Sequence, residues 1–281
     1  MNILLRCITL LLFVSATNAM AREQYSPADS AKAKAYFKES WKHNLHSNKH
    51  QLYLDSALMV MPTHAYYWQQ KSMPLYKTQK YQLAKPYLDS AVKYNADEWL
   101  GYRAYMKCIF AKDYQDALTD LHTALALHGD RPIMDHPYTF YMSLCHLQLN
   151  NLDSCEYYLK GCINDELTRY KDESWVHYNH LFYMGALYYQ KAEYATAITW
   201  LDKALKQYEK FSDAQYYKSM CCYQLDKKQE ALDLMKNAYT NLKGGYSLNE
   251  DNDRYEYYPY QVRKFYMASA VDWMDEEMKK K

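Results

Sequence analysis

Histidine and cysteine are the side chains of this sequence best suited to hold a metal or to attack a substrate. His177 and His180 stand three residues apart, so on a helix they share one face, as paired metal ligands do. No third ligand follows at helical spacing, so we expect two partly exposed histidines at a helix start and no metal site. Neither a serine elbow nor a paired acid accompanies Asp135-His136, so we interpret this pair as another helix start and not as a catalytic dyad.

Six cysteines follow residue 21, each at an apolar or small position of a helical pattern, where a buried thiol behaves as a small hydrophobe. They are Cys108, Cys145, Cys155, Cys162, Cys221 and Cys222. Cys155 and Cys162 lie two helical turns apart, roughly 10 Å, which is too far for a disulfide. We predict free core thiols, with Cys145–Cys155 as the favoured pair if one bridge forms. No CxxC or His/Cys spacing indicates zinc.

Composition and charge exclude several classes of function. The chain has only six glycines, and they form no cluster of the kind that cradles a phosphate. We therefore expect no cofactor and no enzymatic activity. Lys and Arg number 34 against 33 Asp and Glu, so the basic surplus of a nucleic-acid-binding protein is missing. The basic tail at residues 279–281 is too small for a polybasic membrane anchor.

A periodic series of small residues shows which elements position these side chains. The series consists of Ala57, Ala91, Ala124, Cys162, Ala204 and Ala238, with steps of 34, 33, 38, 42 and 34. Three steps agree closely, and the two longer ones indicate insertions. The pentapeptide at 53–57 (YLDSA) recurs at 87–91, again 34 residues on, and LDKA at 201–204 is a third near-copy. The chain is therefore built from a repeated unit.

The clearest unit runs from Tyr178 to Phe211. Gly185 and Ala197 allow two short helices to approach closely, and Leu201 fills the space between them. This spacing resembles the tetratricopeptide repeat, a helix–turn–helix unit of about 34 residues. The resemblance covers about residues 31–246 and implies an all-α fold. We expect a right-handed superhelix (an α-solenoid) of about six helix pairs, in an array spanning 22–257, with a C-terminal capping helix within 258–281.

The same resemblance implies a binding groove on the concave face, lined by the first helix of each unit. The family's groove positions fall on aromatic rings with two basic groups beside them. They are Tyr76, Lys77, Tyr102, Arg103, Phe140, Phe182, Tyr189, Tyr216 and Tyr223. We expect these rings to form a ladder facing water, and Arg103 or Lys77 to hold a ligand's carboxylate. The alternative is that the rings only fill the space between repeats.

The function implied is a non-enzymatic scaffold that binds a peptide segment of another protein in this groove. The alternative is glycan binding, since flat rings in a wet groove also stack on sugar faces. An enzyme whose site the sequence does not reveal is a third and weaker option. Residues 103–114 and 134–150 also look like exported bacterial tetratricopeptide proteins of unassigned function, which suggests a cellular location and no mechanism.

The N-terminal residues have the pattern of a cleaved signal peptide. Arg6 precedes an apolar run at 7–16 that is too short to span a bilayer, and Ala19-Met20-Ala21 offers a small-x-small cleavage site. A lipid anchor needs a cysteine just after the run, whereas Cys7 stands at its start next to Arg6, so we expect no lipid anchor. Removing residues 1–21 would take away one arginine and no acid, leaving a near-neutral chain. We expect an exported protein, periplasmic or secreted, that is soluble after cleavage and has an envelope or secreted protein as its partner.

Overall fold

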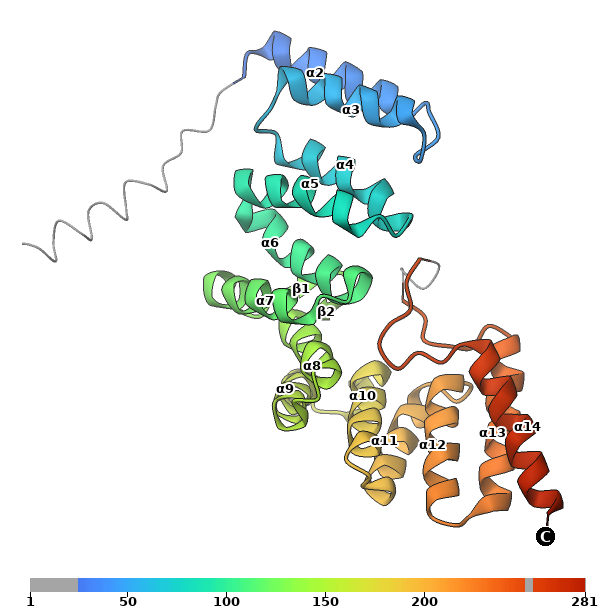
Figure 1. The fold of residues 1–281 in the computed structure, drawn as a ribbon. Helices are drawn as coiled ribbons and strands as arrows, with labels where there is room; N and C mark the ends of the chain where they lie inside the picture. The colour runs from blue at the N-terminus through green and yellow to red at the C-terminus, as the bar shows by residue number, and fades with distance from the viewer. Residues whose placement is uncertain (1–24, 251–254, 281) are drawn as a thin grey trace, which may run out of the picture.

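The computed structural model describes residues 25–250 and 255–280, in which six helix–turn–helix pairs stack in chain order (Figure 1). The first helices of the pairs are α2 (Pro27–Ser40), α4 (Ala65–Lys77), α6 (Ala96–Tyr105), α8 (Tyr138–Gln148), α10 (Tyr178–Gln190) and α12 (Ser212–Gln224). The second helices are α3 (Asn48–Val60), α5 (Tyr81–Tyr94), α7 (Tyr114–His128), α9 (Leu152–Tyr170), α11 (Tyr194–Gln207) and α13 (Lys228–Lys243). A single helix, α14 (Lys264–Lys279), packs on α13 at the end. The all-α solenoid of six pairs plus one helix is confirmed. The expected signal peptide lies outside the described residues.

Small side chains set the distance between the two helices of a pair. The six residues of the periodic series are all buried. A Cβ added at Gly185 of α10 would come within 2.5 Å of Leu201 Cγ in α11, so only glycine permits this approach. The turns that join the helices of five pairs contain a residue with positive φ, which ends the first helix. These residues are Gln79, Lys112, Asn150, Ala192 and Asp226.

The aspartate of the repeated pentapeptide links one unit to the next. Each copy lies on a second helix and pairs with a cation on the first helix of the following unit. The three pairs are Asp55 with Lys71 at 2.5 Å, Asp89 with Arg103 at 2.9 Å, and Asp202 with Lys218 at 2.6 Å. The aspartate therefore recurs at this position because it forms an ion pair between consecutive units.

The two long steps of the series correspond to added structure. Gly129, with φ +71°, ends α7, and a two-stranded ribbon of β1 (Pro132–Ile133) and β2 (His136–Pro137) leads into α8. His136 therefore lies in a strand just before a helix, and not at the helix start that we expected. The other addition lengthens α9 and inserts a 3-10 turn, η2 (Glu173–Trp175), before α10. A π-helical turn, η1 (Met106–Ala111), continues α6.

Two described stretches between α13 and α14, residues 246–250 and 255–263, pack against the interior of the solenoid, and we call them the return segment. In Figure 1 these two stretches extend from the end of the last pair and from α14 toward the middle of the molecule. Leu248 and Tyr258 are buried in the main apolar cluster. The last helix, expected from about residue 259, begins instead at Lys264, because residues 258–262 pack against first helices without forming a helix.

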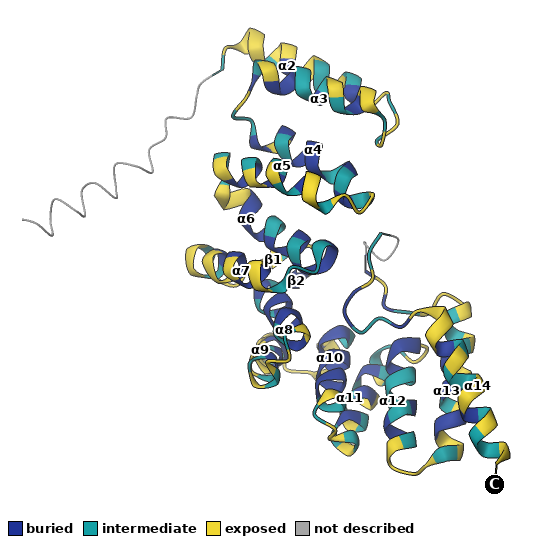
Figure 2. Ribbon diagram, viewed as in Figure 1, coloured by how far each residue is buried: buried dark blue, intermediate teal, exposed yellow. Residues whose placement is uncertain are grey.

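The first helices next to the return segment are buried on nearly every side. In α10 each residue from Asn179 to Leu187 is buried, whereas α11 alternates between buried and exposed positions (Figure 2). A helix that is covered all round lies in the core of its protein. Across the described parts of the chain, no helix combines the length and apolar character needed to cross a membrane.

Candidate functional site

The concave face is the candidate site, and the return segment lies against it. Asp213, in the first turn of α12, is fully buried and holds both ends of this segment. One carboxylate oxygen accepts hydrogen bonds from Leu248 N at 2.9 Å and Ser247 Oγ at 2.8 Å, and the other accepts from Val262 N at 2.6 Å. Burial raises the pKa of Asp213, and the hydrogen bonds that it accepts oppose this rise.

Further contacts join the return segment to the fifth, third and second units. Tyr183 of α10 donates its hydroxyl to Pro259 O at 2.7 Å, and Tyr260 donates its own to Gln190 Oε1 at 3.1 Å. Lys112, after η1, donates to Tyr257 O. Two more contacts join the segment to the second unit. Tyr81 donates its hydroxyl to Glu256, and Lys77 Nζ lies 5.0 Å from the centre of the Tyr255 ring.

These contacts span the second to the sixth unit and use several backbone groups of the segment. Main-chain N–H and C=O groups are common to all sequences, whereas side-chain pockets select particular ones. The face therefore has the chemistry needed to hold an extended chain, and part of it already does so.

Three of the predicted groove rings do not face water, which corrects our expectation for them. Tyr76, Phe140 and Phe182 are 1%, 0% and 0% exposed. Phe182 packs on Phe211, with ring centres 5.0 Å apart, and Phe140 packs on His136 at 4.1 Å. These rings fill the space between units, because aromatic side chains of the same and neighbouring units pack against them.

Arg103 is also placed differently from our expectation. Its guanidinium makes two hydrogen bonds of 2.8 Å to Asp120 and one of 2.9 Å to Asp89, both on second helices. This charge is therefore neutralised within the chain and directed away from the first helices. Lys77, by contrast, lies beside the return segment.

The other four predicted rings are partly exposed. Tyr102 packs edge-on against Trp99, and burial raises its pKa to about 12. Tyr189 and Tyr216 both pack on Tyr217, at 5.3 and 5.1 Å between ring centres. Tyr223 lies 4.5 Å from Trp273 of α14, so the last helix partly covers it. The partly exposed members of the predicted set on first helices are thus Lys77, Tyr102, Tyr189, Tyr216 and Tyr223.

Three histidines come together where the return segment passes α10. One ring nitrogen from each of His136, His177 and His180 lies within 4.8 Å of the other two. Our expectation of no metal site rested on the lack of a third ligand, and His136, 41 residues before His177, supplies one. Burial lowers the pKa of His177 to about 3, with the neighbouring His136 and His180 adding to the effect.

Carboxylates orient two of these imidazoles. His180 Nδ1 lies 2.9 Å from Glu166 Oε2, and His136 Nε2 lies 3.1 Å from Glu250 Oε1 of the return segment. Glu250 also accepts from the Asn179 side chain. Residue spacing within one helix or strand could not predict this group, because its members come from β2, α9, α10 and the return segment.

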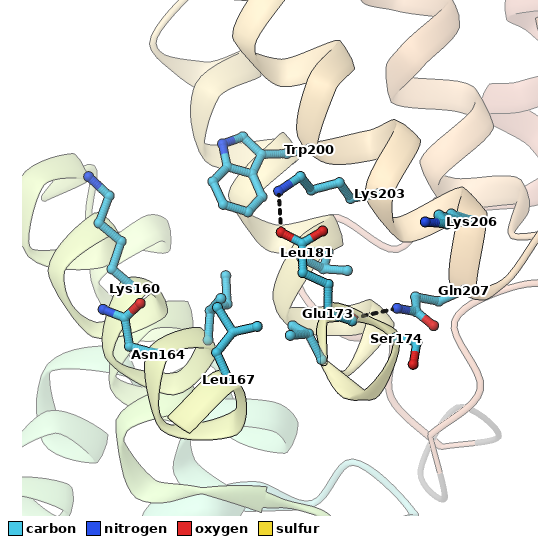
Figure 3. Close-up of a pocket in the computed structure, with 12 residues that line it drawn as sticks. Lys160, Asn164, Leu167, Glu173, Ser174, Leu181, Trp200, Lys203, Lys206 and Gln207 are labelled. Atoms are coloured by element: carbon cyan, nitrogen blue, oxygen red, sulfur yellow. Dashed lines mark hydrogen bonds and ion pairs between the residues drawn. The ribbon is translucent and has the colours of Figure 1, made fainter. Parts of the chain in front are cut away.

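A separate cavity of about 320 Å³ lies on the outer side, between α9, η2 and α11 (Figure 3). Leu167, Val176 and Leu181 form part of its apolar lining. Lysines gather at its rim, where Lys203 pairs with Glu173 at 3.3 Å. The cavity results from the insertion between the fourth and fifth units, and its lining contains none of the predicted groove residues.

All six cysteines of the described residues are buried and free, which confirms the main prediction. The thiol of Cys145 lies against Cys108 and not against Cys155, its expected alternative partner. Burial and this neighbour raise the pKa of Cys145.

Comparisons with known proteins agree with this architecture. Residues 173–238 match the family model described as anaphase-promoting complex, cyclosome, subunit 3. A tetratricopeptide repeat protein from Parabacteroides merdae superposes with a TM-score of 0.61 at 13% identity, covering 87% of this chain and 99% of that one. The type IV pilus biogenesis factor PilW gives 0.58 at 12% identity, covering 78% and 95%.

A chain of the Cut9–Hcn1 hetero-tetramer of the anaphase-promoting complex gives a TM-score of 0.56 at 14% identity, covering 88% of this chain and 42% of that one. No curated protein matches the sequence. At these identities the structural matches establish the fold, in agreement with the stacked helix pairs. This chain therefore has the fold of tetratricopeptide repeat proteins.

Proposed function

We propose that the protein is a non-enzymatic interaction scaffold that binds an extended peptide segment of a partner protein on its concave face. The observation that carries this proposal is the return segment itself. This face already holds one non-helical stretch of chain, through the carboxylate of Asp213, the hydroxyl of Tyr183 and the ammonium of Lys112.

The accessible rings on first helices supply the anchors for a partner. Tyr102, Tyr189 and Tyr216 each combine a large apolar surface with a hydroxyl, the combination that is enriched at protein interfaces. Lys77, at the end of α4, offers a cation for an acidic group of the peptide. The partner that we propose is another envelope or secreted protein, in keeping with the targeting pattern of residues 1–21.

The test is a selection of peptides that bind the full chain, followed by affinity measurements on variants. Random peptides displayed on phage are panned against the protein, and the best is synthesised with a fluorophore for anisotropy. The double variant Tyr102→Ala plus Tyr216→Ala should weaken binding by roughly 2 kcal/mol or more, about 30-fold, because aromatic anchors dominate such interfaces. Phe182 is avoided because its ring belongs to the core.

The matched control is Tyr157→Ala, which removes a ring that is 73% exposed on the second helix α9. This variant should bind the peptide as the unchanged chain does. Equal binding by the double variant, with its helical content intact, would contradict the proposed face. Selection of no peptide, together with retention on a polysaccharide column, would favour the glycan alternative.

A further inference from the structure

We propose that His136, His177 and His180 form a binding site for a divalent transition metal, and that Zn²⁺ is the metal that fits best. Glu250 of the return segment belongs to this site as the carboxylate partner of His136. Three imidazole nitrogens are borderline ligands that suit zinc, which takes His at about 2.0–2.1 Å. This inference is independent of the proposed peptide-binding function.

The distances are close to those of a bound site. Two nitrogens on one tetrahedral zinc ion are separated by about 3.4 Å, as follows from the Zn–N bond length. One nitrogen from each of the three rings lies within 4.8 Å of the others. Since the ring centres are 4.9 to 5.5 Å apart, small side-chain rotations would bring these nitrogens to bonding distance.

The nitrogens have the partners expected of metal ligands. His180 Nδ1 is hydrogen-bonded to Glu166, and its Nε2 is buried without a hydrogen-bond partner. His177 Nδ1 lies 3.3 Å from Asn179 N at the start of α10, and binding of a metal at Nε2 requires this long hydrogen bond to break, because the proton of the neutral ring then lies on Nδ1. Carboxylates beside ligating histidines fix the ring orientation in known metal sites.

Burial separates this group from ordinary surface histidines. His136 and His180 are 1% and 2% exposed, and an uncompensated polar nitrogen at such a depth is costly. His177 is only partly buried, so it provides the side from which an ion can enter. A metal here would fasten β2, α10 and the return segment together.

Binding of Zn²⁺ and Co²⁺ to the full chain, stripped with a chelator, tests the proposal. We expect one equivalent of Zn²⁺ per chain by calorimetry, and a ligand-field spectrum of tetrahedral Co²⁺ that excess Zn²⁺ abolishes. His136→Gln, His177→Gln and His180→Gln should each weaken Zn²⁺ binding at least about tenfold, and Glu250→Gln and Glu166→Gln by about 10- to 100-fold. Hydrogen exchange of residues 246–250 should slow when Zn²⁺ is added to the unchanged chain.

The control is His46→Gln, which removes an exposed histidine in the α2–α3 turn and should leave Zn²⁺ affinity unchanged. Circular dichroism and the thermal midpoint of each metal-free variant identify any that fail to fold. Absence of saturable Zn²⁺ binding by the unchanged chain would overturn the proposal. So would a folded His180→Gln variant that binds Zn²⁺ as tightly as the unchanged chain does.

Discussion

At the scale of single residues, burial controls the chemistry of the cysteines. Burial raises the pKa of Cys155, Cys162 and Cys221 to about 12, so their thiolate forms are scarce near neutral pH. The thiolate is the reactive form of cysteine. We predict that a chain starting at residue 22 reacts slowly with a thiol reagent when native and shows about six thiols when denatured without reductant. A count near four would mean that a disulfide forms, and Cys108–Cys145 would then be examined first.

Burial also gives His64 a role in pH-dependent stability. His64 precedes α4 and stacks on Tyr67, with ring centres 3.9 Å apart, and burial lowers its pKa below 6.5. The unfolded chain therefore takes up a proton on His64 at a higher pH than the folded chain does. The free energy of unfolding should fall as the pH drops below about 6.5. Urea unfolding between pH 7 and 5 should show a shallower fall for His64→Gln.

The substitution His46→Gln controls for the loss of an imidazole as such, since His46 is exposed. If His64→Gln leaves the pH dependence of unfolding as steep as it is in the unchanged chain, the buried ring of His64 does not contribute to it.

At the scale of helices, close approach within a pair limits the size of side chains. Gly185→Ala would place a Cβ 2.5 Å from Leu201, which is buried and has little room to move. We predict a loss of about 1–3 kcal/mol in the free energy of unfolding, measured by urea denaturation, because overpacking forces the helices apart.

Gly161→Ala is the matched control on α9, where an added Cβ meets nothing within 4 Å. This change should stabilise the protein by about 0.5–1 kcal/mol, since alanine is the better helix former. If Gly185→Ala and Gly161→Ala changed the free energy of unfolding by similar amounts, the close packing of α10 on α11 at Gly185 would be contradicted.

At the scale of the whole molecule, Asp213 ties the end of the chain to the interior. Asp213→Ala would leave the buried N–H groups of Leu248 and Val262 without their acceptor, and each such loss costs about 1–3 kcal/mol. We predict a lower urea midpoint and faster hydrogen exchange at both amides. Asp233→Ala, at an exposed position of α13, is the control, and its free energy of unfolding should stay within about 0.5 kcal/mol of that of the unchanged chain. Unaltered exchange at Leu248 in the Asp213→Ala variant would contradict the anchoring role.

The sequence alone determined the repeat, because stacking of identical units imposes a local period. The series from Ala57 to Ala238 marks close helix approaches that each depend on neighbours within one unit. The same locality explains why the core positions of the cysteines were predictable. The repeated aspartates were visible in the sequence. One of their partners, Arg103, was nevertheless assigned to a ligand, because pairing between units leaves no periodic signal.

Only the tertiary structure decided what covers the concave face. Glu250 meets His136 across 114 residues, and Tyr81 meets Glu256 across 175. Such contacts follow from the path of one non-periodic segment, which no spacing within the sequence encodes. For the same reason Phe140 and Phe182 were expected at a water-filled groove and lie in the core. The three histidines likewise become neighbours only because the ribbon before α8 is stacked against the start of α10.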